Sequence, residues 1–350
     1  MHTTIEIAGR KIGPGHPCYI IAELSANHGQ KIDNALALVK VAKDAGADAI
    51  KLQTYRANTI TIDCDTEPFM IRKGTSWEGR RLYDLYEEAH TPWEWHQAIF
   101  EEAAKHGLHC FSSPFDDTAV DFLENLNAPA YKIASFEIVD HGLIARCAAT
   151  KKPMIISTGM ASKEEIAEAV QVARDNGCTQ LALLKCVSAY PAPPEEMNLS
   201  TIADLQQSFD CPAGLSDHTL GTTIPVAAAT LGASIIEKHF TLRRADGGPD
   251  SHFSLEPHEF KDMVSSVRAA QSAIGTPSYQ LTPSQEASRM FRRSLFAVKN
   301  IAAGETFTTE NIRSIRPAHG LPPKDLPKIL GKTATNFIPF GTPLSWDIIS

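Results

Sequence analysis

The sequence predicts an α/β protein, namely a (β/α)8 TIM barrel followed by a small, mostly β domain. Three observations support this fold class. Short apolar runs alternate with helix-patterned segments over residues 15–275. There are eight such runs, and polar residues stand at their carboxyl ends, where barrel enzymes carry their functional groups. After a polar stretch the pattern changes to short apolar segments separated by Pro and Gly, which is typical of a separate β-rich module.

The eight predicted strands are short and mostly apolar. In chain order they read CYIIAE, AIKLQ, LHCFSS, AYKIAS, PMIIST, LALLKC, GLSDH and SIIEKHF. A helix-patterned segment lies between successive strands, so the strands should be parallel neighbours joined by crossover helices. An open doubly wound sheet is the alternative, but no Gly-rich phosphate turn follows the first strand. The pattern therefore favours the closed barrel.

The chain is predicted to have three parts. Residues 1–280 form the barrel domain, beginning with a hairpin over Thr4–Ile12 that should plug the amino-terminal end of the barrel. Residues 281–292 form a polar linker, and residues 293–350 form the terminal module. A module of this size has a marginal core of its own, so we expect it to pack against another domain or subunit. The long segment Arg56–His90 has no clear strand and is predicted to be a lid or docking surface.

Composition excludes several classes of function. The formal net charge is −8, which gives no electrostatic support for binding nucleic acid. No apolar run is long enough to span a bilayer, and the first residues carry no apolar signal core. The seven cysteines are dispersed without a CxxC pair, which predicts reduced thiols in a cytoplasmic protein.

Two histidines stand at the ends of neighbouring predicted strands. His218 closes GLSDH and His239 lies near the end of SIIEKHF, with one crossover helix between them. Both imidazoles should therefore reach the same mouth, where they can share a divalent metal ion. The alternative is one buried and one solvent-facing histidine, but the shared strand–helix–strand unit favours the metal site. Two protein ligands would leave open positions for water and substrate, as in Lewis-acid catalysis.

Lysines occupy inward-facing positions in the second and fourth strands. Lys51 and Lys132 would be costly to bury unpaired, so we predict that they bind a phosphate or a phosphorylated carboxylate. Glu137 is a candidate general base, and its alternative role is a salt bridge with Lys132. For any single serine among the remaining candidates, the alternative is helix capping. The remaining candidates at the strand ends are Glu23, Gln53, Ser135, Ser157, Tyr190 and Ser216.

Eight ordered motifs resemble the sialic acid synthase family. They are IAELSANHG, KLQTY, FSSPFD, YKIASFE, ISTGM, AYPAP, GLSDHT and EKHFT. The terminal SLFAVKNIAAGETFTTENIRSIRPAHG is similar to the antifreeze-like (SAF) domain of that family, so the resemblance covers nearly the whole chain. It implies that the protein condenses phosphoenolpyruvate with an N-acetylated aminosugar, giving a nine-carbon 2-keto acid and free phosphate.

The resemblance also implies roles for individual residues. His218 and His239 would bind the divalent ion, with Mn²⁺ expected first and Mg²⁺ or Co²⁺ as alternatives. Arg316 would reach the sugar across a domain-swapped homodimer, and Ser188 stands where the family often has a phosphate-contacting asparagine. The groups expected to hold phosphoenolpyruvate are Lys51, Lys132, Ser135, Ser157 and Ser216. Those expected to face the sugar are Glu23, Gln53, Tyr190 and Asp250. The catalytic set would comprise Glu23, Lys51, Lys132 and Glu137.

Three further segments resemble one subgroup of the family. ELSANH, LYDLYEEAHTPWEWH and LLKCVSAYPAP are similar to the members that convert 2,4-diacetamido-2,4,6-trideoxy-L-altrose to pseudaminic acid. Members that use N-acetylmannosamine or make legionaminate are the alternatives with the same chemistry. Two other classes remain open at this point. One is a Schiff-base aldolase, since barrels often use a lysine at a strand end. The other is a non-catalytic carbohydrate- or ice-binding protein, which would leave the lysines and histidines of the mouth unexplained.

Overall fold

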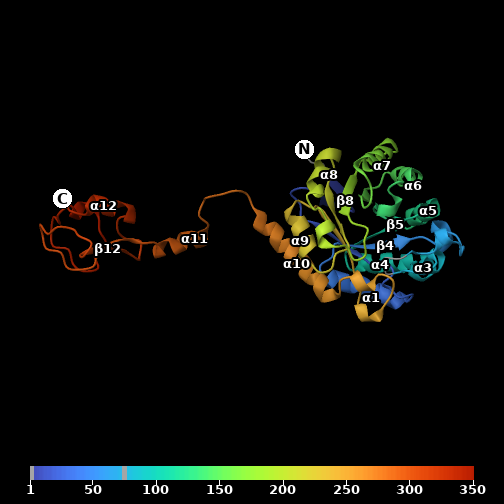
Figure 1. Ribbon diagram of the computed structural model, residues 1–350, viewed down its shortest axis with the longest axis horizontal. Helices are drawn as coiled ribbons and strands as arrows, with labels where there is room; N and C mark the ends of the chain where they lie inside the picture. Colours follow the sequence, from blue (N-terminus) through green and yellow to red (C-terminus); the bar gives the residue numbers. More distant parts are fainter. Residues whose placement is uncertain (1–3, 73–76) are drawn as a thin grey trace. The chain divides into compact units, whose positions relative to one another are not determined.

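The computed structural model describes residues 4–72 and 77–350 and divides the chain into two compact units. The first unit spans Met1–Gly275 and the second Thr276–Ser350. The first is a closed barrel of eight parallel strands surrounded by helices (Figure 1). The predicted TIM barrel is therefore confirmed. Within the described residues, no helix is both long and apolar enough to cross a membrane.

The eight barrel strands follow the predicted order. They are β3 (Tyr19–Glu23), β4 (Ala49–Thr54), β5 (His109–Pro114), β6 (Tyr131–Ile133), β7 (Met154–Ser157), β8 (Leu181–Cys186), β9 (Ala213–Asp217) and β10 (Ile235–His239). Pairing of β10 with β3 closes the barrel, with His239 opposite Glu23. Strand β6 is shorter than predicted, because the chain turns into the 3₁₀ segment η3 (Ser135–Glu137) soon after it.

Helices connect successive strands and cover the outside of the barrel. They are α1 (Ile32–Asp44), α4 (His96–Lys105), α5 (Asp117–Asn125), α6 (His141–Ala148), α7 (Lys163–Asp175), α8 (Thr201–Phe209), α9 (Thr223–Thr230) and α10 (Pro257–Ile274). Helix α7 begins with the predicted capping box, in which Ser162 and Glu165 each accept from the other's backbone N–H. Short 3₁₀ turns lie in the loops after β8 and β10. They are η4 (Pro194–Glu196), η5 (Arg244–Asp246) and η6 (Ser251–Phe253).

A hairpin fills the amino-terminal end of the barrel, as predicted. Strands β1 (Ile5–Ile7) and β2 (Arg10–Ile12) are antiparallel and joined through Ala8 and Gly9, whose φ angles of 47° and 84° fit a tight hairpin turn. The three isoleucines of the hairpin are buried in one cluster with inward-facing strand residues, among them Tyr19 and Phe111. The hairpin therefore completes an apolar layer inside the barrel.

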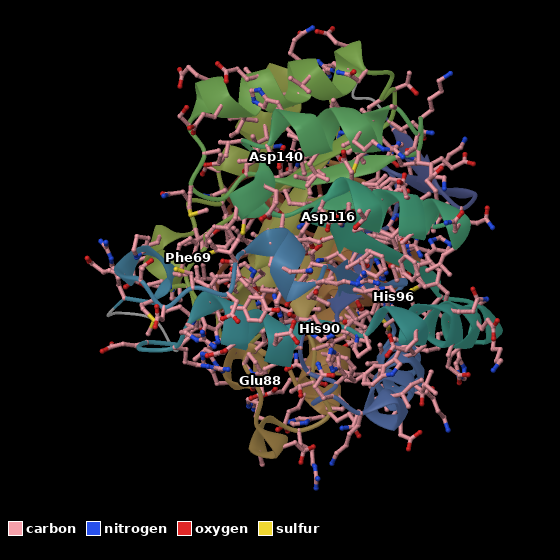
Figure 2. The ribbon with its side chains drawn as sticks, turned by 90° about the vertical axis from the view of Figure 1, so that its right-hand side faces the viewer. Phe69, Glu88, His90, His96, Asp116 and Asp140 are labelled. Atoms are coloured by element: carbon pink, nitrogen blue, oxygen red, sulfur yellow. The ribbon has the colours of Figure 1, made fainter. Side chains whose placement is uncertain are left out.

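The segment between β4 and α4 is more ordered than expected. It contains α2 (Ala57–Ile60), η1 (Glu67–Phe69), α3 (Leu82–Ala89) and η2 (Trp93–Trp95), as well as an isolated bridge between Met70 and Arg81. Figure 2 looks onto this segment, with Phe69 at one edge and Glu88, His90 and His96 spread across the face turned to the viewer. The sequence prediction missed α3, although Leu82, Leu85, Tyr86 and Ala89 recur at helical spacing. Residues 73–76 of the predicted segment lie outside the described residues.

The second unit has a small core of its own. Strands β11 (Ser294–Ala297) and β12 (Ile312–Ile315) pair antiparallel, and Leu295, Phe307 and Ile338 are among the buried residues between the surrounding loops. The short helical segments are α11 (Pro283–Ser288), η7 (Arg289–Phe291), η8 (Pro323–Asp325), α12 (Leu326–Ile329) and η9 (Trp346–Ile348). The predicted linker over residues 281–292 thus contains helix α11.

Candidate active site

The register of the strands gathers polar residues at the carboxyl-terminal mouth. Glu23 lies opposite Lys51 on β4 and opposite His239 on β10, and Ser216 lies opposite Glu237. Side chains alternate between the two faces of a strand, so Ile21, Ala49 and Ala130 of the inward apolar layer are followed, two positions later, by Glu23, Lys51 and Lys132. The mouth therefore carries a polar layer directly above the apolar layer that the hairpin completes.

Two lysines and two glutamates form a buried charge cluster. Lys51 Nζ contacts the Glu23 carboxylate, lies 3.7 Å from Glu237 Oε1 and donates to Ser113 Oγ at 3.3 Å. Lys132 Nζ lies 3.5 Å from the same Glu237 oxygen. Sequence reasoning missed Glu237, although it stands two residues before His239 and so shares its face. It is the group that links the two lysines.

Burial changes the pKa values of the charged groups in this cluster. Burial raises the pKa of Glu23 to about 7, although the neighbouring Lys51 acts to lower it. Burial also lowers the pKa of Lys132, and the Glu237 carboxylate only partly opposes this. For Lys51, burial acts to lower the pKa, but Glu23 and Glu237 outweigh it and the pKa is raised. An anionic ligand would therefore stabilise the charged form of Lys132 most.

A cradle of hydroxyl groups lies beside the lysines. The Oγ atoms of Ser157 and Ser188 are buried without a hydrogen-bond partner, and Ser135 Oγ accepts from the Gly159 N–H at 3.2 Å. A Cβ at Gly159 would lie 2.4 Å from Ser188 Oγ and 2.8 Å from Ser135 Oγ, so any larger residue would displace these hydroxyls. Buried hydroxyls without partners are costly, and a bound anion would satisfy them. Ser216 Oγ donates instead to Glu237, at 3.1 Å.

The two histidines face one another across the mouth. Their ring centroids are 5.4 Å apart. His218 Nδ1 lies 2.9 Å from the Val187 carbonyl, so this nitrogen donates and Nε2 is the atom that would bind a metal ion. His239 Nδ1 is buried without a hydrogen-bond partner. Burial and then the nearby His218 hold the pKa of His239 well below its usual range, so its imidazole is neutral, as metal binding requires.

These features fit a divalent ion held by two imidazoles. Within residues 4–72 and 77–350, no cluster of three or more His, Cys, Asp or Glu side chains is placed to hold a metal ion. The two histidines therefore remain the predicted protein ligands of such an ion. Such a set leaves coordination positions for water and substrate.

The residues expected to face the sugar form a connected polar wall. Gln53 Nε2 donates to Glu23 Oε1 at 3.2 Å and to Ser25 Oγ at 3.1 Å. The Ser25 hydroxyl in turn donates to the Asp250 carboxylate. Sequence reasoning missed Ser25, which lies two residues after the end of β3. Tyr190 stands apart from this wall, with its ring centroid 4.3 Å from that of His218.

Glu137 lies in η3 and has the properties of a proton acceptor. Its Oε2 atom is buried without a hydrogen-bond partner. Burial raises the pKa of Glu137 to about 7, while Lys132 acts to lower it. A carboxyl group that titrates near neutrality is suited to general acid–base catalysis. Arg316 differs from all the other predicted site residues, since it is exposed and lies in the second unit, directly after β12.

Comparison with known proteins identifies the family. Residues 38–279 match the NeuB family and residues 292–349 match the SAF domain. The chain belongs to the NeuB family. This membership confirms the predicted family with its SAF domain, and the class of phosphoenolpyruvate-dependent nonulosonic acid synthases. NeuB enzymes are typically metal-dependent, in agreement with the histidine pair.

Relatives of this NeuB chain match it over nearly its whole length. It is 48% identical over 326 residues to the pseudaminic acid synthase of Campylobacter jejuni strain 81-176, covering 93% of this chain and 95% of the relative. It is 46% identical over 334 residues to the pseudaminic acid synthase of Helicobacter pylori, covering 95% and 98%. The solved N-acetylneuraminic acid synthetase of Leptospira borgpetersenii is 32% identical, with a TM-score of 0.72, covering 82% of this chain and 95% of that one.

Proposed function

We propose that this protein is a pseudaminic acid synthase. It condenses phosphoenolpyruvate with 2,4-diacetamido-2,4,6-trideoxy-L-altrose, giving pseudaminic acid and free phosphate. The observation that carries the proposal is the mouth itself, where two buried lysines, two unpartnered serine hydroxyls and the imidazoles of two histidines converge. The similarity to two pseudaminic acid synthases supports the choice of sugar.

Phosphoenolpyruvate occupies the side of the mouth with the lysines and hydroxyls. Lys51 and Lys132 hold its carboxylate and phosphate, with Ser135, Ser157 and Ser216 as further contacts. Ser188 takes the place of the asparagine often found in the family, because its unpartnered hydroxyl faces Gly159 next to Ser135. A trianionic ligand offsets the burial that lowers the pKa of Lys132.

The sugar binds against the polar wall of Glu23, Gln53 and Asp250. Its open-chain aldehyde lies next to His218 and His239, which would hold a divalent ion, with Mn²⁺ expected first and Mg²⁺ or Co²⁺ as alternatives. Polarisation of that aldehyde is the chemistry that such an ion supplies when bound.

The chain's own residues then position the reactants and move a proton. The methylene carbon of phosphoenolpyruvate forms a bond with the aldehyde carbon, which leaves positive charge on the second carbon of phosphoenolpyruvate. Water adds to that carbon, and ionised Glu137 accepts its proton. The tetrahedral intermediate then breaks the bond between its central carbon and the bridging oxygen, and phosphate leaves with that oxygen. The hydroxyl of the intermediate becomes the ketone, and its proton passes to the alkoxide formed from the aldehyde. Lys51 and Lys132 hold the anionic groups throughout.

The proposal is tested by giving the purified protein phosphoenolpyruvate with each candidate sugar and measuring phosphate release. We expect release with the trideoxy sugar and little with N-acetylmannosamine or the legionaminate precursor. Faster release with either of those sugars would contradict the proposed specificity. A Schiff-base aldolase would instead be trapped by borohydride with pyruvate, and no trapped adduct is expected for this protein.

The active form is proposed to be a domain-swapped homodimer in which Arg316 acts on the partner's sugar site. An inactive His218→Ala chain and an inactive Arg316→Ala chain should then recover activity when mixed and refolded, because one site of the heterodimer has both intact groups. Mixed dimers without activity would contradict the assignment. All seven cysteines are free, which supports a cytoplasmic location for this dimer.

A further inference from the structure

An aromatic wall extends from the histidines to the rim of the mouth. It consists of Trp77, Tyr190 and Phe253. The Tyr190 ring centroid is 4.3 Å from that of His218 and 5.6 Å from that of Trp77. The Phe253 centroid is 4.8 Å from His239 and 5.2 Å from Tyr190. Trp77 is therefore the end of the wall that lies furthest from the histidines.

The three members of the wall come from different loops. Trp77 belongs to the segment between η1 and α3, Tyr190 follows β8, and Phe253 ends η6. Phe253 is buried, whereas Trp77 and Tyr190 are half-buried. Trp77 Nε1 donates to the Pro249 carbonyl at 3.0 Å, which fixes the indole next to Asp250. The wall thus reaches the polar wall of Glu23, Gln53, Ser25 and Asp250 at Pro249, next to Asp250, and has the opposite chemistry.

We propose that Trp77 is a specificity-determining residue that, with Tyr190, receives the C6 methyl group of the 6-deoxy sugar. This inference rests on the proposed function. The aldehyde carbon of the sugar lies at the histidine end of the wall, and the sixth carbon is at the opposite end of its carbon chain. That carbon reaches the Trp77 end, where the apolar ring faces suit a methyl group.

The wall discriminates by chemistry at that one carbon. A 6-hydroxymethyl sugar such as N-acetylmannosamine would lose hydrogen bonds to water when its hydroxyl group is placed against the indole and phenol rings. The indole N–H is already used by the Pro249 carbonyl. A methyl group loses nothing there and gains apolar contact.

A purely structural role for Trp77 makes a different prediction. If the indole served only to hold the loop at Pro249, its removal would displace Asp250 and weaken every sugar to the same extent. The ratio of kcat/KM between a 6-deoxy sugar and its 6-hydroxy counterpart would then stay constant. This ratio therefore separates the two roles.

The test compares two sugars that differ only at C6. They are 2,4-diacetamido-2,4,6-trideoxy-L-altrose and 2,4-diacetamido-2,4-dideoxy-L-altrose, each with phosphoenolpyruvate. For the parent we expect kcat/KM to favour the deoxy sugar at least about tenfold. In Trp77→Ala the ratio should fall to within about threefold of one, with the KM for phosphoenolpyruvate unchanged. Trp77→Phe should keep most of the preference. The matched control Trp93→Phe, whose ring stacks on Phe122 outside the mouth, should keep all of it.

Binding gives a second readout that does not need turnover. The chain has four tryptophans, and only Trp77 lies in the wall. The deoxy sugar alone should quench the protein's fluorescence in the parent and in Trp93→Phe, but not in Trp77→Phe. If Trp77→Ala does not fold, the comparison of quenching between the parent and Trp77→Phe decides whether the sugar contacts Trp77.

The inference is overturned if Trp77→Ala keeps the parent's ratio, or if Trp77→Phe is quenched as strongly as the parent. It is also overturned if the KM for phosphoenolpyruvate rises as much as that for the sugar. A parent that turns over N-acetylmannosamine and neither altrose derivative would contradict the proposed function, and the inference with it. A parent that prefers the deoxy sugar without dependence on Trp77 would contradict the inference alone.

Discussion

The two ends of the barrel interior are built from the same strands with opposite chemistry. At the amino-terminal end, hairpin isoleucines pack against Tyr19, Phe111 and other apolar side chains. Two positions further along these strands, the inward-facing residues include Lys51, Lys132 and Glu237. The first layer is stable because it excludes water. The second layer loses free energy of hydration when its charges are buried. Only the attraction between its lysines and glutamates offsets that loss.

This difference separates stability from function along each strand. Residues of the apolar layer should affect unfolding and leave turnover in the folded protein unchanged. Residues of the mouth should affect turnover and leave stability unchanged or improved, since buried charges and unpartnered hydroxyls weaken a fold. Variants in the apolar layer and in the mouth test whether stability and turnover are separate, and their expected effects differ widely in size.

The largest effect is expected for His239→Ala in the mouth. The loss of one of two metal ligands should lower kcat/KM by at least about 10³-fold, because Lewis-acid stabilisation of several kcal/mol is removed. The thermal midpoint should change little, because the side chain makes no hydrogen bond through Nδ1. Phosphate release and thermal melting, measured on one preparation, check both statements. Near-normal activity in metal-stripped buffer would exclude the metal site.

The opposite pattern is expected for Ile7→Ala in the hairpin. Ile7 is fully buried in the apolar layer, so the cavity should cost roughly 3 kcal/mol of unfolding free energy. The kcat of the folded protein should stay close to that of the parent. Ile62→Ala is the matched control, because Ile62 is exposed and its loss should cost less than about 0.5 kcal/mol. A large fall in kcat for Ile7→Ala would show that the two layers are coupled.

Glu137→Gln should lower activity and raise stability together. Loss of the proton acceptor should reduce kcat at least about 10²-fold. The folded pKa of Glu137 is raised to about 7, so its contribution to stability is present at low pH and is lost as pH rises through 7. The glutamine variant should therefore be more stable than the parent at pH 8, by roughly 2 kcal/mol, and equal to it at pH 4. Denaturant unfolding at both pH values measures this, and a variant less stable at pH 8 would contradict the burial argument.

A smaller, acid-dependent effect on stability is expected at His96, the first residue of helix α4 on the outside of the barrel. Burial lowers the pKa of His96 to about 4, and His96 Nε2 is hydrogen-bonded to Thr54 Oγ1 at 2.8 Å. A lowered pKa contributes stability above pH 6.5 that is lost as pH falls toward 4. Between pH 7 and 5 this loss should be about 2 kcal/mol, and His96→Gln should remove it. If the unfolding free energy falls equally between pH 7 and pH 5 in the parent and in His96→Gln, the lowered pKa of His96 is contradicted.

Much of the fold could be predicted from sequence because its signals are local. The eight strands, the capping box at Ser162 and the hairpin turn at Ala8 and Gly9 each depend on residues a few positions apart. Helix α3 was missed even though its signal is local, since Leu82, Leu85, Tyr86 and Ala89 recur at helical spacing. The division of the chain at Gly275 depends on which residues pack together, and the sequence pattern alone placed the start of the linker later.

The candidate site was predictable where the residue type itself demands a partner. A lysine at an inward position or a histidine at a strand end points to a ligand without knowledge of its neighbours. Glu237 and Ser25 were missed because their importance lies in contacts between strands distant in sequence, to Lys132 and to Asp250. Likewise, no sequence pattern shows that Trp77 contacts Tyr190.

The central claim is that the mouth joins phosphoenolpyruvate to the sugar with cleavage of a carbon–oxygen bond. The most direct measurement uses phosphoenolpyruvate labelled with ¹⁸O at the bridging position, turned over with the trideoxy sugar, followed by mass analysis of both products. Water adds at carbon in the proposed mechanism, so the label should appear in the released phosphate. Label retained in the nine-carbon keto acid would mean attack at phosphorus, and would contradict the roles assigned to the lysines and to Glu137.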